Sequence, residues 1–279
     1  MSDMIRDPAM WNLASPIWLV AILVLLAYGY GVGWKPTRRA AWLVTGLGVL
    51  VFAFVSPVGV LANGYLFSAH MIQHLLLLLV VPLCLVQSLP QSTAERLLQL
   101  PKLGAALRRL LKEPVLGWCL GLGAMWFWHV PSLCNAATQH EALGLVRSVS
   151  FLVAGTAFWW AIYGPIERQR LEPPTAVVYL FSACLGCTLL GIYITFTTVS
   201  VCPAFADPAE RLMLVTKLFD AGFTPSVDQQ VGGLLMWVPP CSLYVCAIIG
   251  VLCRWYSDTS NMSFPQADST GSDLVEVSQ

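Results

Sequence analysis

Seven stretches of this 279-residue chain are apolar, long and free of charged residues. The chain holds 15 Lys and Arg and 15 Asp and Glu, and none of them lies in these stretches, although the stretches cover more than half of the sequence. A transmembrane helix needs about 17–25 such residues to cross the hydrocarbon core of a bilayer. The predicted spans are Pro16–Trp34, Ala40–Val58, Tyr65–Ser88, Pro114–Val130, Ser148–Gly164, Pro174–Val199 and Gln229–Cys253.

The composition excludes the common soluble classes of protein. Hydrophobic residues make up 57% of the chain and charged residues 11%, with a formal net charge of zero. Soluble domains carry about 25% charged residues, nucleic-acid-binding proteins have a basic surplus, and disordered chains are poor in apolar residues. Lipid offers a free backbone amide no hydrogen-bonding partner, and the alternating pattern of a membrane β-barrel is absent. We therefore predict an all-α fold, a polytopic membrane protein built as a seven-transmembrane-helix bundle.

The distribution of cations predicts how this bundle is oriented. Loops enriched in Lys and Arg remain in the cytoplasm, which places the N-terminus outside and the C-terminus in the cytoplasm. Residues 1–256 form the predicted transmembrane domain, and residues 257–279, which are acidic and rich in Ser, form a predicted disordered cytoplasmic tail. The cations of the predicted cytoplasmic loops are Lys35, Arg38, Arg39, Arg96, Lys102, Arg108, Arg109, Lys112, Arg168, Arg170 and Arg254.

Two of the loops carry signals for surface helices. Ser92 and Glu95 have the spacing of a capping box, and they precede a basic amphipathic stretch that we expect on the cytoplasmic surface. Asp207 and Glu210 have the same spacing, with Pro208 at the first helical position. We expect this second helix at the outer interface.

The four histidines all fall on the predicted outer side. His70 and His74 lie in the outer half of the third span, His129 ends the fourth span, and His140 lies in an outer loop. An imidazole within hydrocarbon needs a partner, so a histidine there indicates a functional site. Residues four apart share one helix face, so His70 and His74 are able to bind one metal ion together. They cannot be the two axial ligands of one haem, which would need His129 on the opposite side.

Softer ligands lie close to these histidines in the sequence. Met71 and Met125 lie at a similar depth, and a thioether combined with imidazole suits Cu(I). Asp228 begins the last span, either as a further metal ligand or as a charge that complements the helix N-terminus. The alternative is that the methionines fill the core and that the histidines are buried polar groups, bonded to Gln73, to Thr or to backbone carbonyls.

The cysteines form no zinc pattern. Cys134 and Cys202 both lie in predicted outer loops, where they could form a disulfide if the compartment is oxidising. Cys184 and Cys187 have a Cys-x-x-Cys spacing, but they lie in the middle of a span, where small buried hydrophobic residues are the favoured interpretation. The sequence also lacks a glycine-rich phosphate loop and a carboxylate within a span.

Three motifs of the chain belong together: Tyr65–Leu76, Trp128–Pro131 and Asp228–Pro239. Together they resemble the polytopic CtaG family of cytochrome c oxidase (caa-type) assembly factors, and His70, His74, His129 and Asp228 fall on matching positions. The resemblance extends from about residue 10 to residue 255, and it implies a multi-pass protein of the bacterial cytoplasmic membrane that helps an oxidase to mature by handling copper. The family often has a further histidine at the start of the fifth span, where this chain has Arg147 and Ser148.

The leading hypothesis is therefore a non-enzymatic assembly factor with a shallow copper site on its outer face. Such a site would accept Cu(I) from an external copper donor and release it to a cytochrome c oxidase subunit. One alternative is a b-type haem or quinone-linked oxidoreductase with His74 and His129 as axial ligands. The other is a metal-free structural chaperone. We expect the lipid bilayer as a partner and no nucleic acid. The candidate ligands are His70, His74, His129, Met71, Met125 and Asp228.

Overall fold

A computed structural model describes residues 8–33, 35–206 and 213–262 of the chain. Every regular element in these residues is helical, which confirms the predicted all-α class. The elements are η1 Pro8–Met10, α2 Ile17–Val32, α3 Arg38–Val55, α4 Pro57–Ala62, α5 Phe67–Leu75, η2 Leu76–Val80, α6 Val81–Ser88, α7 Gln91–Gln99, α8 Pro101–Lys112, α9 Pro114–Trp128, α10 Pro131–Gln139, α11 Glu141–Tyr163, η3 Glu167–Gln169, α12 Pro173–Phe196, α13 Pro203–Ala206, α14 Met213–Asp220 and α15 Pro225–Met262.

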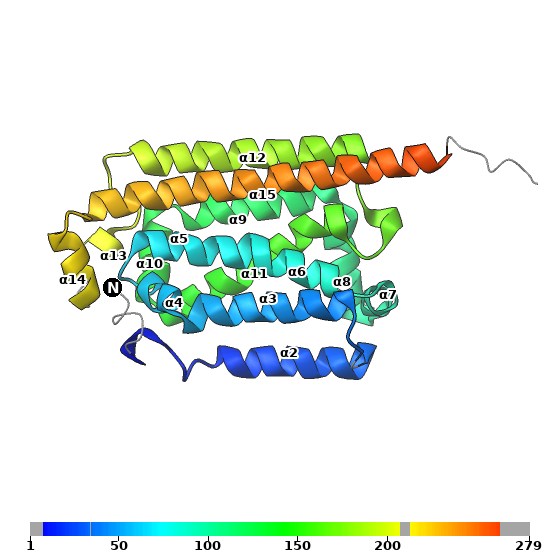
Figure 1. Cartoon of the computed structure of the whole chain (residues 1–279), viewed down its shortest axis with the longest axis horizontal. Coiled ribbons are helices and arrows are strands. Elements are labelled where there is room, and N and C mark those ends of the chain that lie inside the picture. The colour runs from blue at the N-terminus through cyan, green and yellow to red at the C-terminus, as the bar shows by residue number, and fades with distance from the viewer. Residues whose placement is uncertain (1–7, 34, 207–212, 263–279) are drawn as a thin grey trace, which may run out of the picture.

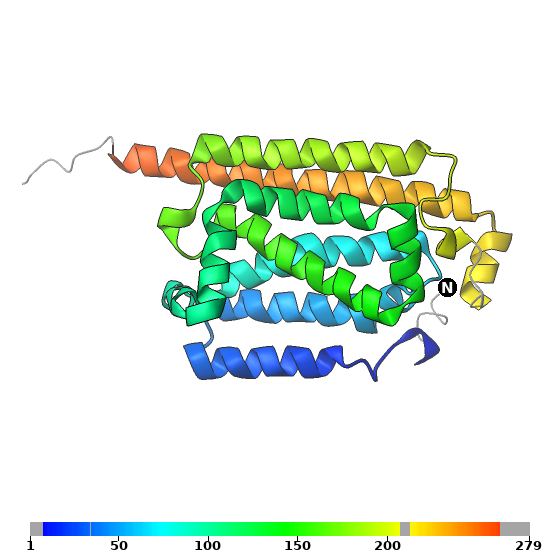
Figure 2. The same ribbon diagram turned by 180° about the vertical axis from the view of Figure 1, so that it is seen from behind.

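The long helices lie along one axis and form a bundle (Figures 1 and 2). Helices α12 and α15 pack side by side, α11 packs on α9 and α6, and α3 packs on α6. The remaining long helix, α2, lies at the edge of the bundle against α3. The short helices α10, α13 and α14 gather at one end, and α7 and α8 lie at the other (Figure 1).

Five helical segments are long and apolar enough to cross a membrane, so the chain is a multi-pass membrane protein. The outward-facing residues of the long helices are apolar, as contact with lipid requires. Helices α2 and α9 are also apolar, but they have 16 and 15 residues, so the count of seven spans remains a prediction. The five segments are Arg38–Val55, Phe67–Ser88, Glu141–Tyr163, Pro173–Phe196 and Pro225–Ser260.

Several predicted boundaries differ from the structure, because a helix does not end where its apolar residues end. Helix α11 begins at Glu141 rather than Ser148, so Arg147 lies within this helix. Helix α15 extends through the position of Ser257, where the predicted tail begins, to Met262. The rest of that tail, 263–279, and the helix start predicted at 207–210 lie outside the described residues.

The capping box predicted at Ser92 does not form. Pro90 occupies the N-cap position of α7, and no side chain caps the helix. Instead, the Gln91 side-chain amide donates a hydrogen bond to the Glu95 carboxylate at 2.9 Å, one turn along the helix. The basic helix that follows, α8, is joined to α7 by the Arg108 guanidinium, which donates to the Leu98 carbonyl oxygen.

The span that carries His70 and His74 is one continuous segment with a change of helix type in its middle. Residues Leu76–Val80 form a π-helical turn between α5 and α6. Pro82 has no N–H to donate to the Leu78 carbonyl oxygen, so an ordinary α-helical hydrogen bond cannot form there. Gly155 of α11 packs directly against this carbonyl, where a Cβ atom would overlap the oxygen. Because Gly155 has no Cβ atom, α11 lies close to the histidine-bearing span at the π turn.

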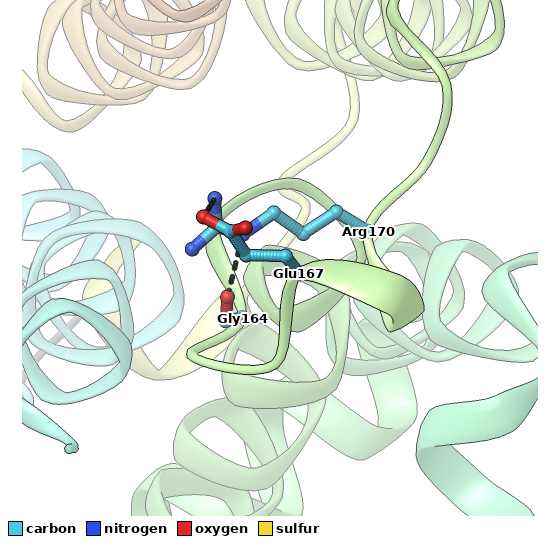
Figure 3. A network of polar contacts seen from close by, with 3 residues as sticks. All are labelled: Gly164, Glu167 and Arg170. Carbon is cyan, nitrogen blue, oxygen red and sulfur yellow. Dashed lines mark hydrogen bonds and ion pairs between the residues drawn. The ribbon is translucent and has the colours of Figure 1, made fainter. Parts of the chain in front are cut away.

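The loop between α11 and α12 is fixed by a small polar network at the end of the bundle where α11 finishes (Figure 3). The Arg170 Nε donates to the Gly164 carbonyl oxygen at 2.7 Å, and its Nη1 lies 3.5 Å from the Glu167 carboxylate. The Trp160 indole N–H donates to the Gln169 side-chain oxygen at 3.1 Å. Arg170, one of the predicted cytoplasmic cations, thus helps to fix the conformation of this loop.

The close contact at Gly155 predicts a helix-packing defect. We expect Gly155→Ala to lower the stability by about 1–3 kcal/mol, because the added methyl group forces α11 away from the Leu78 carbonyl. The measurement is the midpoint of thermal unfolding of the detergent-purified protein. Gly123→Ala in α9 is the matched control, since a Cβ there meets nothing within 4 Å and alanine favours a helix. Equal midpoints for the two variants would contradict this account of the packing.

Candidate metal centre

Three of the four histidines come together at one end of the bundle. The ring centroids of His70 and His74 are 4.1 Å apart, and those of His74 and His129 are 5.5 Å apart. All three side chains are buried, with exposed fractions of 0%, 2% and 3%. His140 is exposed at the end of α10 and is not part of this group. We call His70, His74 and His129 the histidine cluster.

Backbone carbonyls hold two of these rings in a defined protonation form. The Nδ1 of His70 lies 3.0 Å from the Ala62 carbonyl oxygen, and the Nδ1 of His129 lies 2.5 Å from the Met125 carbonyl oxygen. A carbonyl oxygen only accepts, so each Nδ1 must be the donor. In the neutral ring the Nε2 atom then carries a free lone pair, which is the form that binds a metal ion.

Three of the remaining ring nitrogens lack a hydrogen-bond partner among the described residues. His70 Nε2 and both ring nitrogens of His74 are buried without a hydrogen bond, whereas buried polar atoms are nearly always bonded. His129 Nε2 lies 3.3 Å from the sulfur of Met71. The cluster thus presents imidazole nitrogens and one thioether to a single buried region, and this donor set suits a soft metal ion such as Cu(I).

The rings are close, but they are not arranged as a finished coordination shell. Within the described residues, no group of three or more His, Cys, Asp or Glu side chains is arranged to hold a metal ion. The rings of His70 and His74 are tilted at 57° and also contact aromatic rings. Phe205 lies 4.9 Å from His70, and Phe151 lies 4.7 Å from His74, measured between centroids. The three rings as they stand therefore do not form a closed coordination shell.

The other two candidate ligands, Met125 and Asp228, have structural roles. The Met125 carbonyl oxygen accepts a hydrogen bond from His129 Nδ1. Met125 also lines a small separate cavity of about 10 Å³ beside Phe158 and Tyr244. Asp228 accepts hydrogen bonds from the backbone N–H groups of Phe67, at 2.6 Å, and Ser68, at 3.0 Å. Metal binding by either residue remains a prediction.

Asp228 acts as the cap of a helix that is distant in sequence. The N-cap residue of α5 is Leu66, whose side chain has no acceptor. The buried carboxylate of Asp228 on α15 takes this role, where it also complements the positive end of the α5 dipole. The interaction fixes the start of the helix that carries His70 and His74 onto α15.

Gln73 is not a partner of the histidines, although the sequence allowed for it. Its side-chain amide donates to the Ala53 carbonyl oxygen of α3 at 2.8 Å. The part of the alternative interpretation that bonds the histidines to Gln73 is therefore wrong, and the part that bonds them to backbone carbonyls holds for one nitrogen each of His70 and His129.

A disulfide and a pocket lie next to the cluster. Cys134 of α10 and Cys202, just before α13, are joined, with 5.6 Å between their Cα atoms. A pocket of about 160 Å³ is lined by Phe67, Ser200, Cys202, Phe205 and Gln229, among others. Phe205 contributes to this pocket and also packs against His70, so one aromatic ring separates the pocket from the cluster. Sequence reasoning missed Phe205, because only the fold brings α13 to α5.

Arg147 is the second residue that sequence reasoning missed. Its side chain is only 7% exposed, and its Nη1 atom is buried without a hydrogen-bond partner. Its position in the second turn of α11, rather than in a loop, explains this burial.

The chain is similar to proteins of one family. A family model described as "Cytochrome c oxidase caa3 assembly factor (Caa3_CtaG)" matches residues 10–258. The chain is 25% identical to the uncharacterized protein ML1998 of Mycobacterium leprae, over 97% of this chain and 44% of that protein. It is 26% identical to the uncharacterized protein Mb0105 of Mycobacterium bovis, over 83% of this chain and 37% of that protein. The chain thus spans less than half the length of these relatives, and no solved structure matches it.

The capping role of Asp228 predicts a loss of stability on a nearly isosteric change. In Asp228→Asn, one carboxylate oxygen becomes an NH₂ group that cannot accept from a backbone N–H, so one buried donor of α5 loses its partner. We expect the free energy of unfolding to fall by about 1–3 kcal/mol. The measurement is chemical or thermal unfolding in detergent, with Asp220→Asn at the exposed end of α14 as the control. Similar stabilities of the two variants would contradict the capping role.

Proposed function

The chain belongs to the Caa3_CtaG family of cytochrome c oxidase caa3 assembly factors, and from this premise we propose that it carries Cu(I) at the histidine cluster for the assembly of an oxidase. The role is non-enzymatic, and the copper ion is cargo. The observation that carries the proposal is the set of buried imidazole nitrogens of His70 and His74 that have no hydrogen-bond partner among the described residues.

The donor set supports copper in its reduced state. Imidazole nitrogen and thioether sulfur are together suited to Cu(I). His70 and His129 are oriented through their Nδ1 atoms by backbone carbonyls, which leaves Nε2 for the ion. The sulfur of Met71 lies beside His129 Nε2. A site of two or three imidazoles with one soft ligand binds the ion firmly but leaves a position for exchange.

The position of the cluster suits transfer on the outer side of the membrane. The cluster lies toward the end of the bundle where α10, α13 and α14 gather (Figure 1). The basic helix α8 lies at the opposite end, which the positive-inside rule assigns to the cytoplasm. The protein thus accepts Cu(I) from an external donor and releases it to an oxidase subunit in the bacterial cytoplasmic membrane.

A haem site is less well supported by this geometry. A b-type haem would have to lie between His74 and His129, whose ring centroids are 5.5 Å apart. Phe151 and Met71 pack against these same rings. A single ion fits between side chains that are so close, whereas a macrocycle would force the helices apart.

The proposal predicts copper binding that depends on the cluster. We expect purified wild-type protein to bind one Cu(I) per chain and the His70→Ala/His74→Ala double variant to lose it, with loss of oxidase activity in cells that depend on this factor. His140→Ala is the matched control, because His140 is exposed and outside the cluster. Elemental analysis, a visible spectrum and oxidase assays measure the outcome.

Each alternative function gives a different result in the same experiment. A strong Soret band in the purified protein would establish the haem hypothesis in place of copper. A wild-type protein without copper, together with full oxidase activity of the double variant, would leave only a metal-free chaperone. Equal copper loss in His140→Ala would show that binding is not confined to the cluster.

A further inference from the structure

A buried cation lies on the face of α11 that packs against the histidine cluster. Arg147 is 7% exposed, its Nη1 atom has no hydrogen-bond partner among the described residues, and none of their carboxylates lies within 4 Å of it. A charge buried in this way is costly unless it is paired, so its place in the bundle calls for a functional explanation.

The turn of α11 that follows Arg147 packs against both elements that carry the cluster. Phe151 lies one turn further along the same face of α11, and its ring packs on His74 at 4.7 Å. The Ser150 hydroxyl donates to the Arg147 carbonyl oxygen at 2.7 Å and accepts from the Trp128 indole N–H at 2.8 Å. Trp128 directly precedes His129. The turn that holds Arg147 therefore has little freedom to move away from the histidines.

We propose that Arg147 makes the cluster selective for monovalent over divalent metal ions. The inference rests on the proposed function, since it describes which ions the same site accepts. Imidazole ligands alone bind divalent copper and zinc strongly, so a site of this kind needs a further feature to exclude them. A fixed positive charge disfavours divalent ions more than monovalent ones, because Coulomb repulsion is proportional to the charge of the bound ion.

The Coulomb repulsion sets the ratio between the affinity changes of a divalent and a monovalent ion when the Arg147 charge is removed. Removal of the Arg147 charge relieves twice as much repulsion from a divalent ion as from a monovalent ion at the same position. The logarithm of the affinity should therefore change twice as much for the divalent ion. The same repulsion weakens the hold on Cu(I), which favours release to an acceptor.

The test compares two ions on charge-removing and charge-retaining variants. Ag(I) is the monovalent probe and Zn(II) is the divalent probe, with dissociation constants measured on the full-length protein in detergent. For Arg147→Gln we expect Ag(I) to bind about tenfold more tightly and Zn(II) about a hundredfold more tightly. Arg147→Lys keeps the charge and should keep the wild-type ratio of the two constants.

Further outcomes separate this inference from the proposed function. Equal tightening for both ions, or weaker binding of both in Arg147→Gln, would overturn the selectivity role; weaker binding would show instead that Arg147 holds an anion that accompanies the metal. If neither ion binds to wild type or to any Arg147 variant, the proposed function fails and the selectivity fails with it. Arg147→Met, which also lacks the charge, must reproduce the Arg147→Gln ratio, and thermal unfolding of each variant identifies any misfolded protein.

Discussion

A polar group inside a membrane bundle has no water to bond with, and this constraint organises the end of the bundle that holds the histidines. Asp228 accepts hydrogen bonds from two backbone N–H groups at the start of α5. The Gln73 side-chain amide donates a hydrogen bond to a backbone carbonyl of α3. Among the described residues, the buried side-chain atoms without a hydrogen-bond partner are three nitrogens of His70 and His74, one of Arg147, and single atoms of Trp118, Asn135 and Trp159. The largest group of unpaired atoms thus lies in the histidine cluster.

The packing of three elements brings the cluster together. The π turn at Leu76–Val80 allows α11 to approach the histidine-bearing span at Gly155. This approach brings Phe151 of α11 onto the His74 ring. The loop after α9 adds His129, whose ring is held by its own preceding turn. The chemistry of the site therefore depends on backbone contacts at residues that never touch a ligand.

The sequence predicted the parts of this site that follow from local spacing. His70 and His74 share a helix face because they are four residues apart, and the outer position of Cys134 and Cys202 suggested their disulfide. The capping of α5 by Asp228 was not predictable, because it joins residues about 160 positions apart in the chain. The burial of Arg147 was missed because apolar patterning placed it at the edge of a span. Pattern reasoning finds which residues share an element, whereas only the tertiary packing decides which elements meet.

The disulfide between Cys134 and Cys202 has a consequence for biogenesis. Cystines persist in the periplasm or outside the cell and are reduced in the cytosol. A bond between Cys134 and Cys202 at the end of the bundle beside His70 would form when that end meets a thiol-oxidising system. The disulfide is therefore consistent with the orientation that the Lys and Arg distribution predicts, on independent chemical grounds. It would also make folding of this end of the bundle depend on the redox state of its compartment.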